Sequence, residues 1–303
     1  LLPCVAASTI IFGANTLLVT GVTVAACVLF EYLYCFLMKK PNPVGDLSAV
    51  VTGIILAMNM PVSMPLWIAV VGAFIAIVIA KQLFGGIGMN FANPALLARI
   101  VLFTGFASRM TAWVYPDKCT RTFLMLGVDA ASGATPLQVP GGVGKYPLMD
   151  LFLGTHGGVM GETCALAILI GFAILLFTRT ISAAIPVTYV GSYAVFSFLL
   201  NVGELGAADA AMLVLHEVLA GGLLFGAVFM ATDYVTSPFT LKGKIVFGIG
   251  LGLITFGIRA FGNMAEGVSY AILLMNLFVP YINDLTRQVP LGYKKHKKGA
   301  KKA

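Results

Sequence analysis

Three carboxylates, Glu31, Asp233 and Asp284, lie within or beside long apolar segments. In a membrane an ionised carboxylate is costly unless it is paired or solvated, which makes such residues functional candidates. Glu31 is the leading one, because the nearest basic residue in the sequence, Lys39, is about two helical turns away. A carboxylate can bind Na+ or carry a proton, so the three predict ion coupling. The structural alternatives are that Asp233 caps a helix and that Asp284 pairs with Arg287.

The composition indicates that most of the chain lies in lipid. Of 303 residues, 59% are hydrophobic and 10% are charged, whereas a soluble domain is about 25% charged. In lipid only helices and closed barrels satisfy the backbone, and the apolar stretches here are continuous rather than alternating. The sequence therefore predicts an all-α integral membrane protein. It excludes an ordinary soluble enzyme, a nucleic-acid binder and a disordered scaffold.

About ten apolar segments can be marked, and a bilayer span needs about 20 residues. The third segment is short and stops at Pro61 and Pro65. Short segments interrupted by Pro or Gly are typical of broken helices around a site. The segments cover roughly 1–19, 21–38, 47–60, 64–84, 89–107, 162–179, 183–201, 210–231, 244–260 and 265–283.

Basic residues predict the orientation. The net charge of +7 comes mostly from the tail lysines Lys294, Lys295, Lys297, Lys298, Lys301 and Lys302. A basic tail behind a span is typical of the cytoplasmic side, where most other basic residues, Lys81 among them, then also lie. Arg99 is not counted on either side, because it lies within the apolar segment at roughly 89–107. Both termini are thus predicted to be cytoplasmic, with the loop 108–161 outside. Because Leu1 is already in an apolar run, we expect a short piece before it, and no signal-peptide pattern is present.

An internal repeat is predicted from matched segments. The run that begins at Phe84 resembles the run at Phe261, and Leu97 corresponds to Leu274, both 177 residues apart (261 − 84 and 274 − 97). Halves with an odd number of spans must insert in opposite orientations, and sites in such folds lie at broken helices. We therefore expect two inverted five-helix repeats, as in urea transporters. The predicted parts are a first repeat at 1–107, the outer loop at 108–161, a second repeat at 162–283 and a cytoplasmic tail at 284–303.

The outer loop contains a segment that resembles the acceptor motif for covalent flavinylation. Its defining positions are Asp129, Ser132, Gly133, Ala134 and Thr135. In that motif a flavin transferase joins FMN through its phosphate to the final threonine. A threonine hydroxyl suits a phosphoester, and the two small residues before it leave room for the transferase. The small residues alone would favour a solvated turn, but the leading aspartate and the membrane context favour flavin attachment.

Further segments extend the resemblance over nearly the whole chain. They are 65–68, 84–95, 161–163, 229–233 and 266–271. Together they are similar to the D subunit of the Rnf complex and the homologous B subunit of the Na+-translocating NADH:quinone reductase. The compact length favours the Rnf protein, because the B subunit typically has an N-terminal extension. Tyr234 departs from the family pattern, in which we expect Pro.

The resemblance implies a flavoprotein subunit of a redox-driven ion pump in a bacterial or archaeal cytoplasmic membrane. Such a complex is an oxidoreductase that passes electrons between ferredoxin and NAD, coupled to Na+ or H+ translocation. It implies FMN bound covalently to Thr135 and leaves room for a second, non-covalent flavin, riboflavin. The implied partners are the other Rnf subunits, especially the FMN-bearing G subunit, and a flavin transferase. The protein's share of the chemistry is to position and tune the flavin.

Two asparagines, Asn90 and Asn93, follow a break rich in glycine. Either side chain could cap the helix that begins there or bond the polar edge of an isoalloxazine ring. Two asparagines in a membrane break favour the second interpretation, so we predict that both hold the second flavin.

Other polar motifs have simpler interpretations. Glu162 and Thr163 follow a Gly-rich run and are interpreted as a helix N-terminal cap. His216 and Glu217 have no second ligand set at metal spacing, so we predict a contact between helices and no metal site. The alternatives to the Rnf protein are the quinone-reductase B subunit and a flavin-free channel or scaffold, which has no need of the flavin motif.

Overall fold

The computed structural model describes residues 1–41, 43–114, 137, 146–262 and 267–287. Every regular element in these ranges is a helix. This confirms the predicted all-α class.

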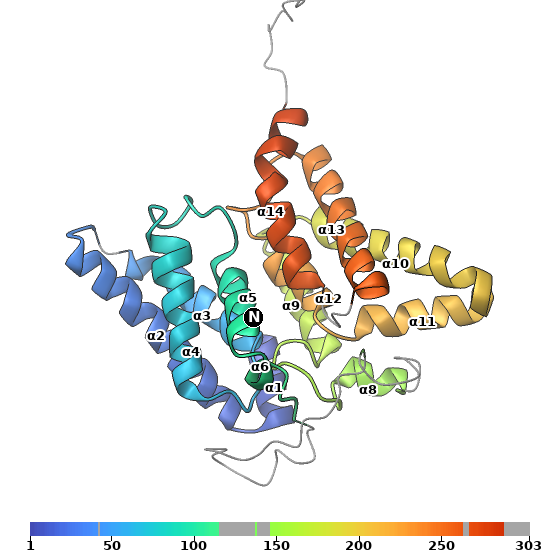
Figure 1. Ribbon diagram of the computed structural model, residues 1–303, viewed down its shortest axis with the longest axis horizontal. Coiled ribbons are helices and arrows are strands. Elements are labelled where there is room, and N and C mark those ends of the chain that lie inside the picture. Colours follow the sequence, from blue (N-terminus) through green and yellow to red (C-terminus); the bar gives the residue numbers. More distant parts are fainter. Residues whose placement is uncertain (42, 115–136, 138–145, 263–266, 288–303) are drawn as a thin grey trace, which may run out of the picture.

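The first half of the chain forms one lobe (Figure 1). Helix α2 packs against α3, α4 and η2, and α4 continues directly into η2, which is a π-helix. The bounds are α1 Leu2–Phe12, α2 Asn15–Leu37, η1 Val44–Asp46, α3 Ser48–Met58, α4 Leu66–Phe74, η2 Ile75–Gln82, α5 Pro94–Gly105 and α6 Ala107–Met110.

The second half forms the other lobe, in which α10 packs against α11 and α13. Gly248 and Gly252 of α13 lie against Thr188 and Ser192 of α10, so closely that a Cβ at either glycine would collide. Small residues allow this approach between membrane helices. The bounds are α8 Leu148–Leu153, α9 Ala165–Phe177, α10 Ala184–Leu205, α11 Ala207–Leu219, α12 Leu223–Phe225, η4 Gly226–Met230 (a second π-helix), α13 Leu241–Phe261 and α14 Val268–Leu285.

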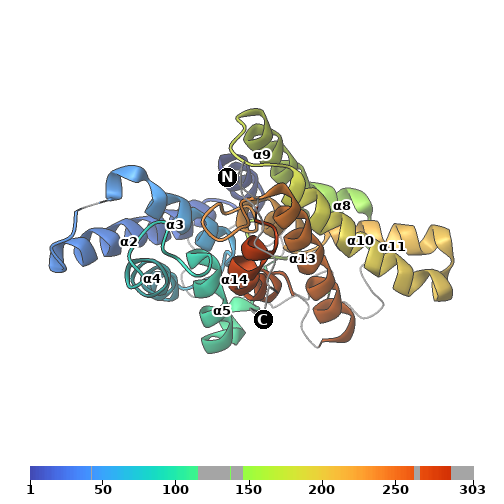
Figure 2. The ribbon, with the colours of Figure 1, turned by 90° about the horizontal axis from the view of Figure 1, so that it is seen from above.

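The two halves meet along helices that pair across the centre of the molecule. Helix α1 contacts α9, and α5 contacts α14. In Figure 1 the outer helices α2 and α11 lie at opposite sides, and Figure 2 shows the same separation from above. The centre is therefore where a site shared by both halves would form.

Membrane-spanning length distinguishes two classes of helix. Helices α2, α10, α13 and α14 are long and apolar enough to cross a bilayer, and α11 with α12 and η4 forms a fifth candidate, bent by 64°. The shorter apolar helices are α1, α3, α4 with η2, α5 and α9. Each predicted segment contains one of these elements, but the number of crossings stays a prediction. One boundary is wrong: Gly13, at a φ of 82°, ends α1, and α2 begins at Asn15 rather than at 21.

One polar contact of the first half has a counterpart in the second half at the spacing of the predicted repeat. Asn59 and Thr236 are 177 residues apart, as are Arg99 and Asn276 (236 − 59 and 276 − 99). Arg99 donates to the Asn59 side-chain oxygen at 2.7 Å. The Asn276 amide, with its nitrogen as donor, bonds the Thr236 carbonyl oxygen at 3.1 Å. Such recurrence is expected of a repeat, whose inverted orientation remains a prediction.

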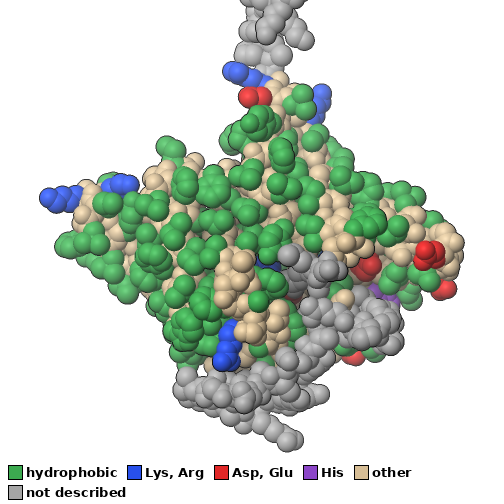
Figure 3. Space-filling view, in the orientation of Figure 1, with side chains coloured by type: hydrophobic (Ala, Val, Ile, Leu, Met, Phe, Trp, Pro, Cys, Tyr) green, Lys and Arg blue, Asp and Glu red, His purple; other side chains and the backbone are tan. Residues whose placement is uncertain are grey.

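The surface explains why the fold needs lipid. Hydrophobic side chains cover most of the face in Figure 3, and the charged side chains gather near its margins. Large apolar residues are widely exposed, among them Ile10, Phe177 and Tyr281. A water-soluble monomer rarely exposes such continuous apolar area, so the chain is an integral membrane protein.

Candidate functional site

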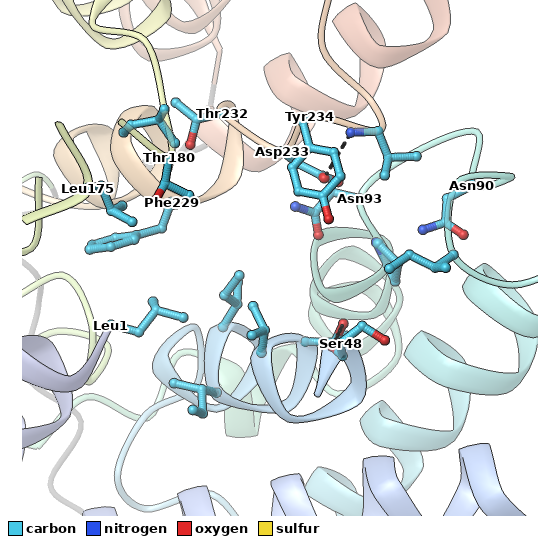
Figure 4. A pocket seen from close by; sticks show the side chains of 18 of the residues that line it. Leu1, Ser48, Asn90, Asn93, Leu175, Thr180, Phe229, Thr232, Asp233 and Tyr234 are labelled. Carbon is cyan, nitrogen blue, oxygen red and sulfur yellow. Dashed lines mark hydrogen bonds between the residues drawn. The ribbon is translucent and has the colours of Figure 1, made fainter. Parts of the chain in front are cut away.

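A cavity of about 540 Å³ lies where the two halves meet (Figure 4). Its walls come from α1, α3, η2 and the residues before α5 in the first half, and from α9, η4 and the residues after η4 in the second. This volume lies within the usual range for small-molecule sites of about 300–1,000 Å³. The polar or charged residues that line it are Asp46, Ser48, Thr52, Lys81, Asn90, Asn93, Thr180, Thr232, Asp233 and Tyr234.

Asn93, one of the predicted flavin residues, has a structural role at this cavity. Its side-chain oxygen accepts the N–H groups of Ala95 at 3.1 Å and Leu96 at 3.4 Å, so it caps α5. Its amide nitrogen donates to the Met230 carbonyl oxygen at 3.4 Å. The capping interpretation is therefore confirmed, and Asn93 also joins the two halves. Its flavin role stays a prediction.

Asn90 differs from Asn93 because part of its side chain has no bond. Its Oδ1 atom is buried and has no hydrogen-bond partner in the described part of the chain, although the residue lines the cavity. A buried acceptor without a partner costs about 1–3 kcal/mol. A ligand that presents an N–H group here would remove that cost.

Asp233 lines the same cavity as Asn93 (Figure 4). Its two carboxylate oxygens accept the Val235 N–H at 3.2 Å and the Thr236 hydroxyl at 3.1 Å. Asp233 thus stabilises a turn rather than capping a helix. Burial raises the pKa of the Asp233 carboxyl, although these two hydrogen bonds act against the rise.

Glu31 is completely buried and forms an ion pair that the sequence did not reveal. Its Oε1 atom lies 2.6 Å from the Lys81 ammonium and 2.8 Å from the Gln82 amide nitrogen, while Oε2 has no hydrogen-bond partner among the described residues. Lys81 is 2% exposed, so it is a buried partner of Glu31, and the side of the membrane on which it lies stays a prediction. Both partners of Glu31 belong to the π-helix η2, and π-helical turns are frequent at functional sites.

Arg99 and Glu162 form a second buried ion pair, which the sequence interpretation missed. The Arg99 guanidinium lies 2.9 Å from the Glu162 carboxylate, and both side chains are at most 4% exposed. The predicted N-terminal cap by Glu162 and Thr163 is wrong, because α9 begins at Ala165 without a side-chain cap. The one available signal was a charged arginine inside an apolar segment, which needs a buried partner.

Comparison with known proteins places this geometry in a family. The model of the NQR2, RnfD, RnfE family matches residues 1–292. The chain belongs to this family. It is 42% identical to the D subunit of the Na+-translocating ferredoxin:NAD+ oxidoreductase complex of Acetobacterium woodii, over 99% of this chain and 90% of that protein. It is 37% identical to the D subunit of the proton-translocating ferredoxin:NAD+ oxidoreductase complex of Clostridium ljungdahlii, over 93% of this chain and 85% of that protein.

The family matches the resemblance seen in the sequence motifs. A third relative, the D subunit of the ion-translocating oxidoreductase complex of Vibrio atlanticus, is 36% identical over 96% of this chain and 92% of that protein. The first two relatives are named for different ions, Na+ and the proton. Membership of the NQR2, RnfD, RnfE family therefore does not select the ion.

Two further predictions about charged residues have clear outcomes. Asp284 is exposed in the last turn of α14, and within the described part of the chain it makes no ion pair, so its predicted pairing with Arg287 is wrong. Glu217 accepts the hydroxyls of Tyr193 at 3.0 Å and Ser197 at 2.6 Å, which confirms a contact between α10 and α11. The described ranges contain no cluster that could hold a metal ion.

The flavin motif residues Asp129, Ser132, Gly133, Ala134 and Thr135 lie outside the described residues. Their role therefore rests on the sequence and stays a prediction.

Proposed function

We propose that this chain is the flavin-bearing D subunit of an Rnf-type complex. The complex passes electrons between reduced ferredoxin and NAD and couples this to Na+ or H+ translocation. Family membership and the names of the relatives support the proposal. The structural observation that carries the flavin assignment is the cavity with the unpartnered Asn90 oxygen.

The cavity fits a non-covalent flavin, for which riboflavin is the candidate. A flavin ring has apolar faces and a polar edge with an imide N–H donor. Val228 and Phe229 of η4 and Ile54 of α3 supply apolar wall, and Asn90 supplies a buried acceptor. When bound, the flavin would supply one- and two-electron redox chemistry. Around it the protein would exclude water and orient the ring.

The covalent FMN belongs on Thr135 in the outer loop, with Asp129, Ser132, Gly133 and Ala134 presenting it to a flavin transferase. The FMN-bearing G subunit is the proposed electron donor on that side, alongside the other subunits of the complex. The proposed location is the cytoplasmic membrane of a bacterium or archaeon.

We rank Glu31 and Asp233 above Asp284 as the residues that couple ion movement to electron transfer. Glu31 is buried with one carboxylate oxygen unpartnered, and Asp233 lines the central cavity. Asp284 is exposed at the end of α14, where water can solvate its charge. Glu31 and Asp233 are therefore better placed than Asp284 to bind an ion inside the molecule.

Replacing Asn90 with alanine tests the cavity as a flavin site. We expect affinity for the extractable flavin to fall about fivefold, which corresponds to the loss of one hydrogen bond of about 1 kcal/mol. Covalent flavin should be unchanged. The measurement is the flavin released by denaturing the purified complex, together with the ultraviolet fluorescence that stays on the denatured subunit.

Asn201→Ala is the matched control, because within the described ranges the Asn201 amide bonds only to Ser197 of its own helix. It should leave both flavin pools at the parent level. If Asn90→Ala also leaves extractable flavin unchanged, the cavity does not hold it.

The proposed orientation predicts which sites an impermeant thiol reagent can reach. In a background without the five native cysteines, Gln138→Cys should be labelled in intact cells and Tyr293→Cys only after the membrane is broken, because the basic tail favours the cytoplasm. Labelling of the tail alone in intact cells would invert the orientation.

A further inference from the structure

Lys81 lies between two oxygen acceptors on different elements. Its ammonium is 2.6 Å from the Glu31 Oε1 atom on α2 and 2.5 Å from the Ser48 hydroxyl at the start of α3. The Ser48 hydroxyl in turn donates to the Asp46 carboxylate at 2.5 Å. Asp46 is exposed, whereas Glu31 is completely buried. A continuous set of polar groups thus leads from a buried carboxylate to an exposed one.

The charges in this cluster do not balance. Glu31 and Asp46 are two carboxylates, and Lys81 is the ammonium that lies between them. Among the described residues no other charged side chain bonds to these three. Water can solvate the exposed Asp46 carboxylate, whereas the Glu31 carboxylate is buried and its Oε2 atom has no hydrogen-bond partner among the described residues, so Glu31 has an acceptor left for a small cation.

We propose that Lys81 is a tethered cation that competes with the transported ion for Glu31. This rests on the proposed function as an ion pump. The ligand is a monovalent cation, either Na+ or a proton, that the Glu31 carboxylate takes up. When the ion binds, the Lys81 ammonium moves onto the Ser48–Asp46 pair. When the ammonium returns to Glu31, it displaces the ion.

The physical basis is repulsion between two cations at one carboxylate. In a buried site this repulsion is weakly screened, so ion and ammonium cannot both be held closely by Glu31. A lysine suits the role because its charge sits on a flexible stem, and its second acceptor is already within bonding distance. Lys81, Ser48 and Asp46 all line the central cavity, which gives the ion a route to Glu31.

The proposal predicts opposite effects for two substitutions, measured in the whole complex reconstituted in liposomes. Lys81→Met removes the competitor, so the Na+ concentration for half-maximal electron transfer should fall at least tenfold. Ser48→Ala removes the second acceptor and keeps Lys81 on Glu31, so that concentration should rise about threefold or more. If the ion is a proton, the pH profile without Na+ moves instead, upward for Lys81→Met and downward for Ser48→Ala, because the ammonium and the proton compete for the same carboxylate.

Lys244→Met is the matched control, because Lys244 bonds the Ser182 hydroxyl at 3.2 Å and, among the described residues, no carboxylate. It should leave the ion dependence unchanged. If Lys81→Met does not fold, the proposal is tested by two other variants. These are Ser48→Ala and the double variant Glu31→Gln with Lys81→Met. The double variant should assemble with normal covalent flavin but move at least fivefold fewer ions per electron.

Two results would contradict the proposal that Lys81 is a tethered cation. One is that the half-maximal Na+ concentration, or the pH profile, shifts in the same direction in both single variants. The other is full ion transport by the double variant. Either would make the pair structural. A parent complex without flavin or without electron transfer from ferredoxin to NAD would instead contradict the proposed function itself.

Discussion

Replacing Thr135 with alanine should abolish the ultraviolet fluorescence of the denatured subunit. Without the hydroxyl no phosphoester can form, so the expected loss of covalent FMN is complete rather than partial. The protein should stay in the membrane at the parent level, because Thr135 lies outside the apolar segments marked in the sequence. The measurement is in-gel fluorescence of the denatured band with an immunoblot for the same band, in cells that express the flavin transferase.

Ser132→Thr is the sharpest control, because the motif accepts either hydroxyl residue at that position. It should keep the fluorescence, whereas Asp129→Ala should reduce it if the aspartate contributes to recognition by the transferase. Fluorescence that survives Thr135→Ala would place the flavin elsewhere. A parent protein that shows none, with the transferase present, would support the flavin-free channel.

The helical segments could be predicted because hydropathy is a local property of the sequence. The third segment was expected to be short, and α3 indeed ends at Met58, before Pro61. The boundary at Gly13 was missed because apolar residues continue on both sides of it and hide the break. The π-helices η2 and η4 were also missed, since composition does not distinguish a π turn from an α turn.

The buried ion pairs could not be predicted, because each joins residues far apart in the sequence. Lys81 is 50 residues from Glu31, and Arg99 is 63 residues from Glu162. The cost of a lone charge in an apolar segment indicates that a partner exists, but it does not identify the partner. The search near Glu31 reached only Lys39, because it considered neighbours along one helix.

At the candidate site, too, contacts between sequence neighbours could be predicted, whereas contacts between residues far apart in the sequence could not. Asn90 and Asn93 were proposed together as flavin residues and Asp233 separately as an ion-coupling residue, and the fold brings all three to one cavity. The cap made by Asn93 is local and was anticipated. The unpartnered oxygen of Asn90 depends on which side chains fail to reach it, which only the packed structure reveals.

Replacing Arg99 with methionine should destabilise the protein by about 3–5 kcal/mol, which is the usual cost of removing one partner of a buried ion pair. Arg99 donates to Asn59 of the first half at 2.7 Å and to Glu162, just before α9, at 2.9 Å. Its loss therefore removes a charge from a buried site and a link between the two halves. The measurement is thermal unfolding of the detergent-solubilised complex, followed by the amount of assembled protein that remains after heating.

A double variant separates the cost of the charge from the cost of the link. Arg99→Met combined with Glu162→Gln removes both charges, so it should recover much of the lost stability, because a neutral pair of similar volume needs no ionic compensation. Arg109→Met is the control, since Arg109 is exposed, and it should change stability by less than about 0.5 kcal/mol. If the Arg99 and Arg109 variants lose equal stability, water reaches the Arg99 pair. If the double variant is no better than Arg99→Met alone, the main contribution of Arg99 is its bond to Asn59 and its packing between the halves.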